Sequence, residues 1–387
     1  MGHGLVQALS GAGEIVRSAF ASTNAANSLS DLARDLAAGA GDLVVLFVSP
    51  TKDINHLAAE ADRLFAPARV VGCTTAGELA DQGYSDGGIV AVLLPRSHFC
   101  SRILPIPDLS GYDTEALNDQ NVRNRNEMIR EEPDWASEFA LLLVDGHSLK
   151  EDALVANLGP SLGPVPLFGG SAGDGTAFGP TFILCGGRAV TNAAVLVQIR
   201  TRCPIKVFKT DHLVPTEQRM VVTGANPAAR IVHEINAEPA AREYARLLGK
   251  DSEQLTTFTF AAHPVVVRFG DQHHVRSIQR VAENGDLVFF SAIDEGVVLT
   301  LADTQDMVEH LKSEMHGLSA SARPDIILAC DCILRRMEAQ QKQKTREISQ
   351  ILADNRVVGF CTYGEQVNSM HVNQTLTGVA IYPPAEV

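Results

Sequence analysis

Apolar runs of five or six residues alternate with longer helix-like segments along much of the chain. Three of these runs are apolar at every position, as strands buried on both faces of a sheet are. They lie at 43–48, 139–144 and 326–330. A segment with helical character follows each run, and parallel strands joined by right-handed crossovers through helices satisfy this order. The sequence therefore predicts an α/β fold of repeated β-α-β units, with mixed, mainly parallel sheets in two packed domains and additional hairpins.

One motif, VVGxxTxGE, occurs near both ends of the chain. Residues 70–78 and 357–365 share both valines, both glycines, one threonine and the glutamate. An apolar run begins at the same distance after each glutamate, at Ile89 and at Leu376. Because a strand-like run and a helix-like segment also precede each motif, each half reads strand, helix, strand, loop and strand.

A third, partial unit lies between these two. The strand predicted at 139–144 precedes a helix around 149–162 and, after a second strand, the glycine-rich segment 168–175. Two apolar runs then flank a Gly-Gly pair at 186–187, which predicts a hairpin and hence some antiparallel pairing.

The length of 387 residues exceeds the roughly 250–300 at which a single core stops growing, so two domains are predicted, residues 1–215 and 216–387. In the second domain, a helix is predicted over 227–248, because a proline stands at its start and a glycine follows its end. The polar, asparagine-rich segment 113–133 reads as a surface excursion.

Composition is that of an ordinary globular protein, with 45% hydrophobic and 20% charged residues. No apolar run approaches the roughly 20 residues that span a bilayer, and the N-terminal segment lacks the pattern of a secretory signal, so a cytoplasmic location is expected. The formal net charge of −14 disfavours nucleic acid and anionic membranes as partners. Seven cysteines without framework spacing predict free thiols, mostly in the core.

The two VVGxxTxGE segments are the leading candidates for a binding site. Ligands of α/β sheets collect beyond the carboxyl ends of strands, where glycines let the backbone approach and hydroxyl and carboxylate groups face a crevice. The candidate pocket residues are Gly72, Thr75, Gly77, Glu78, Thr362, Gly364 and Glu365. Alternatively, the glycines serve tight turns and each glutamate caps its own loop.

The segment 168–175 carries Asp174 as a further pocket candidate, although an aspartate that caps a turn is the alternative. No Gly-Lys-Ser/Thr follows it and GxGxxG is absent, so nucleotide binding has little support. Ser171 does not stand in GxSxG, and Asp331 between two cysteines lacks zinc-site spacing. An enzyme is therefore not predicted.

Two histidines are singled out. His371 follows the second motif within the segment 366–375, which also supplies Asn373 to the candidate pocket, and His212 follows an apolar run. A lone histidine is more often a hydrogen-bonded structural residue than a ligand, although neutral imidazole is a common axial ligand of haem iron. Cys203 ranks behind them as a thiolate ligand, and the pair at 273–274 reads as solvated.

Taken together and in order, these motifs resemble the FIST family of sensory domains, with its N-terminal and C-terminal parts. The resemblance extends over 43–381 and includes 72–78, 144–146, 168–174, 212–216, 234–236, 276–279, 292–296, 330–336 and 359–381. It implies a stand-alone signal-input protein that binds a small ligand and reports in trans to a histidine kinase, a cyclic-di-GMP enzyme or a chemotaxis protein.

Members that end in a segment like 364–375 are similar to haem-containing nitric-oxide sensors of two-component systems. The resemblance thus implies a haem role for His371 first and for His212 second, with Cys361 and His147 standing where less reactive residues are expected. The leading hypothesis is a haem-based nitric-oxide sensor, which can form a homodimer.

Two other functions stay open from the residues themselves. A small polar metabolite such as an amino acid, held without haem by Thr75, Glu78, Thr362 and Glu365, is the alternative. An enzyme built from converging carboxylates ranks third, because such groups would show perturbed pKa values.

Overall fold

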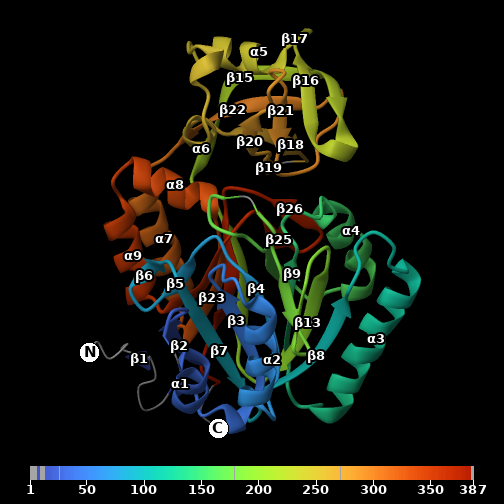
Figure 1. The fold of residues 1–387 in the computed structure, drawn as a ribbon, viewed down its shortest axis with the longest axis vertical. Coiled ribbons are helices and arrows are strands. Elements are labelled where there is room, and N and C mark those ends of the chain that lie inside the picture. Colours follow the sequence, from blue (N-terminus) through green and yellow to red (C-terminus); the bar gives the residue numbers. More distant parts are fainter. Residues whose placement is uncertain (1–6, 9–13, 26, 178, 271, 385–387) are drawn as a thin grey trace.

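The molecule has a broad base with a smaller β-rich insert above it (Figure 1). We term residues 14–212 and 305–384 the base and residues 213–304 the insert. The computed structural model describes residues 7–8, 14–25, 27–177, 179–270 and 272–384.

Three sheets of the base share one strand order: an edge strand, an antiparallel strand, and then a parallel pair. The first runs β1 (Gln7–Ala8), β2 (Arg17–Ser22), β7 (Gly88–Pro95), β3 (Gly41–Val48), β4 (Arg69–Thr74), β11 (Ile183–Cys185), β12 (Arg188–Val190). The second runs β8 (Phe99–Ile106), β13 (Ala194–Thr201), β9 (Ser137–Val144), β10 (Leu167–Ser171), β25 (Glu365–Val367), β26 (Met370–Val372). The third runs β14 (Ile205–Thr210), β27 (Leu376–Ile381), β23 (Ile326–Cys332), β24 (Val357–Thr362), β5 (Glu78–Ala80), β6 (Gly83–Ser85).

Each base sheet ends in a hairpin that another unit supplies. The hairpin β5–β6, which follows β4 of the first sheet, extends the third sheet. The hairpin β25–β26, which follows β24 of the third, extends the second, and β11–β12, which follows β10 of the second, extends the first. The exchange closes a cycle, so the base is a threefold arrangement of one repeated unit. The predicted third unit is confirmed.

The α/β class with mixed sheets is confirmed. Each base sheet holds one parallel pair, β3 with β4, β9 with β10 or β23 with β24, between antiparallel neighbours. Antiparallel pairs therefore outnumber parallel ones among the described strands, because every unit returns through its own hairpin and edge strand.

Alternation of side chains along these strands builds a core in layers. In β3, Leu43, Val45 and Phe47 face a central core shared by all three sheets, whereas Val44 and Leu46 face the outer helices. Both faces are buried, which explains why the run is apolar at every position. The outer layer consists of helices that cover each sheet (Figure 1).

The helices of the base include the asparagine-rich segment, which is a helix capped by Asp113 rather than irregular chain. They are α1 (Ser28–Asp35), η1 (Ala38–Ala40), α2 (Ile54–Phe65), α3 (Thr114–Glu131), α4 (Glu151–Leu162), α7 (Met307–Ser319), α8 (Ile333–Gln341) and α9 (Thr345–Asp354). Of the seven cysteines, Cys185 is partly exposed and the others are buried, as predicted.

The insert is a twisted sheet between β14 and α7. Its strands run β19 (Gln272–Val275), β18 (Val265–Phe269), β22 (Val298–Thr304), β15 (Leu213–Asn226), β16 (Ile231–Ile235), β21 (Leu287–Phe289), β20 (Ile278–Val281), with β17 (Glu238–Pro239) beside β16. Its helices are η2 (Pro227–Ala229), α5 (Ala240–Leu247), η3 (Ser252–Gln254) and α6 (Thr257–Ala262). The helix predicted over 227–248 is wrong in its first half, where β16 pairs with β21.

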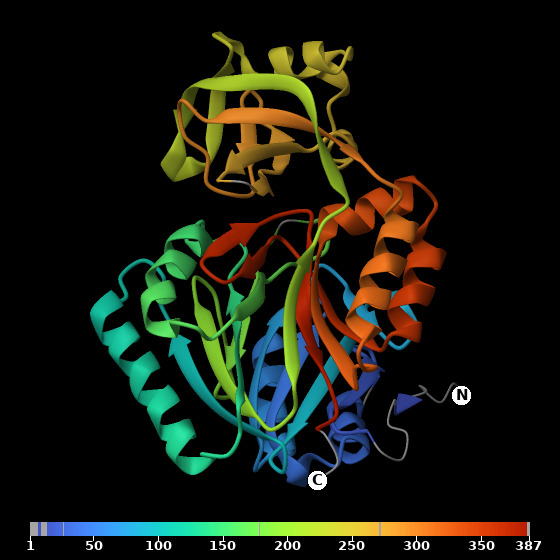
Figure 2. The ribbon, with the colours of Figure 1, turned by 180° about the vertical axis from the view of Figure 1, so that it is seen from behind.

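Two neighbouring chain segments connect the insert to the base, as β15 rises and β22 returns (Figure 2). The amide of Gln305 donates to the carbonyl of His212 at 2.8 Å, so the two crossings are bonded to each other. The domain boundary predicted between 215 and 216 falls within β15 and stays a prediction.

Candidate functional site

The three loops between a parallel pair and its exchanged hairpin meet and bond to one another through their backbones. Each loop contacts both others. The hydrogen bonds run from Ala76 N to Cys361 O (2.9 Å), Cys361 N to Gly77 O (2.7 Å), Gly173 N to Thr74 O (3.0 Å), Gly175 N to Thr75 O (3.2 Å), Ser171 N to Gly364 O (2.8 Å) and Tyr363 N to Ser171 O (3.2 Å). The backbone amides of these loops are therefore used to interlock the units.

The two loop glutamates are fully buried and occupy matching positions. Glu78 accepts a hydrogen bond from Thr75 at 2.5 Å, and Glu365 accepts one from Thr362. Burial raises the pKa of Glu78 to about 7 and that of Glu365 to about 8, although hydrogen bonds from the threonines oppose the shift. Each carboxyl group closes its own loop, and neither borders the cavity described below.

The loop glycines stand where other atoms come close. A Cβ on Gly72 would lie 2.2 Å from the carbonyl oxygen of Leu46, and one on Gly77, where φ is +122°, would lie 1.8 Å from Arg336 Nη1. Asp174 accepts a hydrogen bond from the hydroxyl of Tyr363, which belongs to another loop. The structure thus brings the predicted loop residues together as a structural junction.

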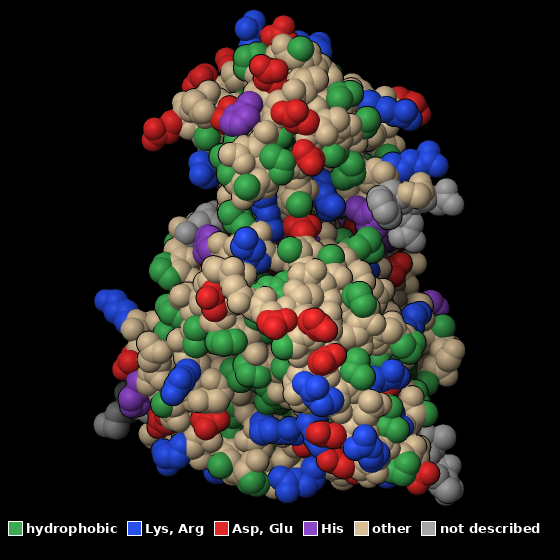
Figure 3. Space-filling model, turned by 90° about the vertical axis from the view of Figure 1, so that its right-hand side faces the viewer, with side chains coloured by type: hydrophobic (Ala, Val, Ile, Leu, Met, Phe, Trp, Pro, Cys, Tyr) green, Lys and Arg blue, Asp and Glu red, His purple; other side chains and the backbone are tan. Residues whose placement is uncertain are grey.

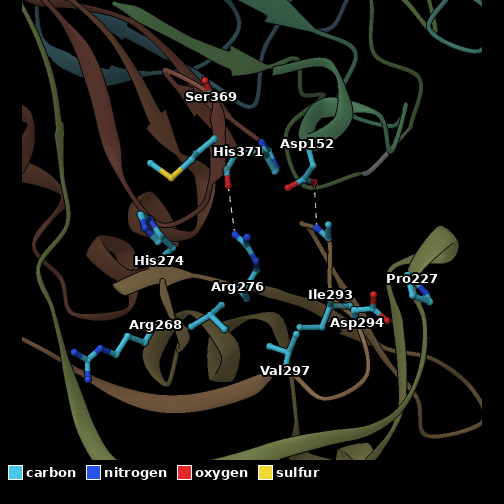
Figure 4. A pocket seen from close by; sticks show the side chains of 13 residues that line it. Asp152, Pro227, Arg268, His274, Arg276, Ile293, Asp294, Val297, Ser369 and His371 are labelled. Atoms are coloured by element: carbon cyan, nitrogen blue, oxygen red, sulfur yellow. Dashed lines mark hydrogen bonds between the residues drawn. The ribbon is translucent and has the colours of Figure 1, made fainter. Parts of the chain in front are cut away.

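A cavity of about 430 Å³ lies elsewhere, between the insert and the base (Figure 4). The side view shows the narrowing between the two parts, where charged and histidine side chains gather (Figure 3). The insert contributes Pro227, Val267, Arg268, His274, Arg276, Ala292, Ile293, Asp294 and Val297 to its lining. The base contributes Asp152 of α4 and Ser369, Met370 and His371 around β26.

Arg276 is one of two arginines that line this cavity, with Arg268. Its Nη1 donates to two carbonyl oxygens, of Val275 at 3.3 Å and of His371 at 3.4 Å, and it forms no ion pair with a described residue. Burial lowers the pKa of Arg276, and the charge of Asp152 opposes this shift. A guanidinium group stays protonated even so, and it leaves a positive charge at the cavity without a carboxylate in contact.

His274 borders the cavity from β19, opposite Val267 of β18. Its side chain is buried, which corrects the expectation that the pair at 273–274 is solvated: only His273 is exposed. Burial lowers the pKa of His274, so the ring is neutral at pH 7. Its Nδ1 is buried and has no hydrogen-bond partner among the described residues.

Comparison with known protein families shows which family the chain belongs to. A model of the FIST N domain matches residues 42–238, and a model of the FIST C domain matches residues 240–368. The chain belongs to the FIST family. A search of curated proteins found no match. The two matches meet inside the insert, so each of them includes parts of both the insert and the base.

FIST domains serve small-ligand sensing in signal transduction, and this FIST protein is a sensory protein of that kind. Of the helices that the structure describes, none is long and apolar enough to cross a bilayer. Within the same described residues, no three His, Cys, Asp or Glu side chains converge as metal ligands.

His371 is the one predicted site residue of this FIST protein that lines the cavity. Its Nδ1 lies 3.2 Å from Gln366 Nε2, and its Nε2 is buried without a partner among the described residues. A Cβ on Gly364 would lie 2.8 Å from Nε2, so the ring packs against that glycine. Asn373, the residue after β26, is also buried, and neither polar atom of its side chain has a hydrogen-bond partner among the described residues. Neither nitrogen of His371 is presented to the cavity.

His212 lies at the crossing between base and insert and is fully engaged there. Its Nδ1 lies 3.0 Å from Arg335 Nη1, and because a guanidinium group only donates, Nδ1 accepts. The proton is therefore on Nε2, which donates to Glu338 at 2.9 Å. No lone pair is left for a metal. Cys203 is buried in the central core, where burial raises the pKa of its thiol.

Three cavity residues, Asp152, His274 and Arg276, were missed by reasoning from sequence. They come from α4, from β19 and from the turn after it, and no spacing along the chain connects them. One signal was available, since Arg276 begins a segment that supports the family resemblance. A charged residue within such a segment, next to an apolar strand, is a candidate for binding.

Proposed function

We propose that this FIST protein senses a small organic anion with an apolar body, which binds in the cavity between insert and base. Arg276 binds the anionic group. Val267, Ile293 and Val297 contact the apolar part, since their side chains line the same space. Small-molecule sites combine such an apolar lining with a few placed polar groups.

The observation that carries the proposal is the charge of Arg276, which forms no ion pair with a described residue. A half-buried cation without a carboxylate partner in that part of the chain is costly, and an anionic ligand supplies the missing charge-assisted hydrogen bonds. Because the cavity walls come from both parts of the molecule, a ligand contacts both at once only when they are apposed. Binding therefore favours one arrangement of insert and base, which is how a ligand changes the surface seen by a partner.

Replacing Arg276 by methionine is expected to weaken binding of such an anion about 100-fold, as loss of a charge-assisted hydrogen-bond pair does. Arg276→Lys keeps the charge without the planar fork and should lie in between. Calorimetric titration with phenylacetate, indole-3-acetate, phenylalanine and leucine, and with uncharged benzyl alcohol, measures this. Arg280→Met, at an exposed position of β20, is the matched control.

The panel separates the classes of anion. Binding of phenylalanine with no binding of phenylacetate would favour an amino acid, whose ammonium group Asp152 faces from the base. Equal binding of benzyl alcohol and phenylacetate, unchanged in Arg276→Met, would contradict the proposal. Glu78 and Glu365 are outside the cavity, so their replacement is not expected to abolish binding.

Haem is a second candidate ligand, favoured by His274. Haem is itself an apolar body with two carboxylates, and it would supply an iron atom able to bind nitric oxide. His274 supplies a neutral imidazole at the wall of the cavity that contains Arg276, whereas Nε2 of His371 is buried against Gly364 and both nitrogens of His212 are hydrogen-bonded. On this ground we propose His274 as the axial ligand ahead of His371 and His212.

His274→Ala is expected to abolish a specific Soret band after reconstitution with hemin, while His273→Ala, one residue away and exposed, keeps it. His371→Ala and His212→Ala serve as comparisons. Visible absorption of the ferric, ferrous and nitric-oxide-treated forms measures this. A Soret band that survives in His274→Ala but not in His371→Ala would return the ligand to the residue that the family resemblance implied.

The output proposed for this sensor is regulation of a partner in trans, either a histidine kinase or a cyclic-di-GMP enzyme, in the cytoplasm. The family resemblance supports this, and a ligand that contacts both insert and base gives it a physical basis. A pull-down with candidate kinases, with and without the bound anion, tests it.

A further inference from the structure

The insert contacts the base at two edges of the interface, which differ in character. Between them, Gln374 of the base accepts a hydrogen bond from Ser277 and donates one to the carbonyl of Ala261. At one edge the chain crosses twice, at His212 and Gln305, and the ring of His212 is held by Arg335 and Glu338 of α8. At this edge the chain itself connects insert and base, and hydrogen bonds to α8 hold the connection in place. The insert can therefore rotate about this edge but not move away from it, as at a hinge.

At the other edge the side chain of Arg230 and the backbone amide of Ala292 reach the base. Arg230, just after η2, donates through Nη2 to Glu151 at 2.6 Å and to Asp152 at 3.0 Å, both in the first turn of α4. Its Nη1 donates to the carbonyl of Phe290, which fixes the guanidinium to the insert. Arg230 and Glu151 are 3% and 2% exposed, so the ion pair is shielded from water.

The backbone of Arg230 is itself unusual. Its φ of +55° is in the left-handed region, which a residue with a side chain adopts at a cost and keeps only where its contacts require it. The contact with Glu151 and Asp152 is such a requirement. Within the insert, the backbone of Arg230 is held in this conformation by its N–H, which donates to Pro227, and by its carbonyl, which accepts from Phe289.

Asp152 belongs to this edge and to the cavity at once. Its Oδ2 accepts from Arg230 and from the amide of Ala292, while its side chain lines the cavity across from Arg276 (Figure 4). Arg230 thereby neutralises an acid that would otherwise repel an anion in the cavity. The ion pair at this edge therefore also determines how much negative charge Asp152 contributes to the binding site.

We infer that Arg230, Glu151 and Asp152 form a latch that sets the equilibrium between a closed and an open position of the insert, with the hinge at His212. An anion in the cavity binds the closed form more tightly, because only there does it contact both walls and meet a neutralised Asp152. Arg230 and Glu151, which do not line the cavity, thus change the apparent ligand affinity without contacting the ligand. This coupling rests on the proposed function, whereas the latch itself does not.

Arg230→Met and Glu151→Gln are the test variants, because neither residue lines the cavity. Without ligand, both are expected to speed amide hydrogen exchange at least 10-fold in segments 150–155 and 290–294, and to leave exchange in β3 unchanged. Arg280→Met is the control in the insert. Should Arg230→Met not fold, Glu151→Gln, which keeps the shape of the side chain, carries the test alone.

Phenylacetate is the probe for the coupling. In the variants its affinity should fall at least 10-fold, since only the closed fraction binds, and saturating phenylacetate should restore slow exchange. Wild-type exchange at both segments in folded variants would overturn the latch. Fast exchange in the variants combined with no binding of any anion to the wild type would overturn the proposed function and leave the latch standing.

Discussion

Replacing Gly72 by alanine is expected to lower the free energy of unfolding by about 3 kcal/mol, at the upper end for overpacked cores. The new Cβ would lie 2.2 Å from the carbonyl oxygen of Leu46 and 3.0 Å from its Cβ. Because Gly72 and Leu46 are paired in the parallel strands β4 and β3, relief requires the strands to separate. Urea denaturation followed by circular dichroism measures the change.

The matched control is Gly317→Ala in α7. No atom lies within 4 Å of a Cβ at Gly317, and alanine is the better helix former by roughly 1 kcal/mol, so this variant should be as stable as the wild type or more stable. If Gly72→Ala instead kept full stability and lost ligand binding, Gly72 would be a binding residue as the sequence first suggested, and the structural role would be refuted.

Equivalent glycines explain why the repeat was visible in the sequence. Gly169 and Gly359 occupy the position of Gly72 in the other two units, where a Cβ would lie 2.0 Å from Leu142 O and 1.8 Å from Ala329 O. The same close approach of two parallel strands selects glycine three times. The glycines of the motif are therefore explained by the packing of two strands within each unit. From the sequence alone, their position at the end of a strand was equally compatible with a ligand-binding loop.

The exchange of hairpins could not be read from the sequence. Glu78 and Leu79 pair with Phe360 and Gly359 of β24, about 280 positions later, and local patterns give no information on such pairing. Nor did hydrophobic periodicity locate α3, because its buried face carries the amides of Asn121 and Asn124. In the insert, Pro227 begins only a 3-10 turn, after which Ile231 and Val232 pair with β21.

The cavity was missed for a related reason. A site formed where an inserted sheet faces the base depends on how the two parts are apposed, and that is determined by contacts between residues far apart in the sequence, such as those of Arg230 and His212. His371 was found because it lies beside a recognisable loop. Its ring is at the cavity wall, yet the same packing against Gly364 turns its free nitrogen away.

Replacing Glu365 by glutamine is expected to remove much of the loss of stability that the protein shows as pH rises. Burial raises the pKa of Glu365 to about 8 in the folded protein, whereas an unfolded chain exposes the carboxyl group, with its ordinary pKa near 4.5. The folded state therefore binds more protons than the unfolded state between these values. Its stabilising contribution is complete below about pH 4.5 and is lost as pH rises through about 8.

Glutamine reproduces the protonated form of this side chain. Its oxygen can accept from the amide of Thr375 at the position of Oε2, and its NH₂ can donate to Thr362 Oγ1 at the position of Oε1. The measured quantity is the difference in unfolding free energy between wild type and Glu365→Gln at a series of pH values. This difference cancels the contributions of the histidines, which titrate in the same range.

That difference should fall as pH rises from 5 to 8, by up to about 1.4 kcal/mol per pH unit, and then level off. Glu283→Gln, at an exposed position, should show no such trend. Glu78, whose pKa burial raises to about 7, should behave like Glu365 but level off earlier. A difference that stays constant from pH 5 to 8 would mean that water reaches Glu365. The loops would then be open to a ligand, because the interlocked arrangement that keeps the carboxyl group protonated also excludes solvent from it.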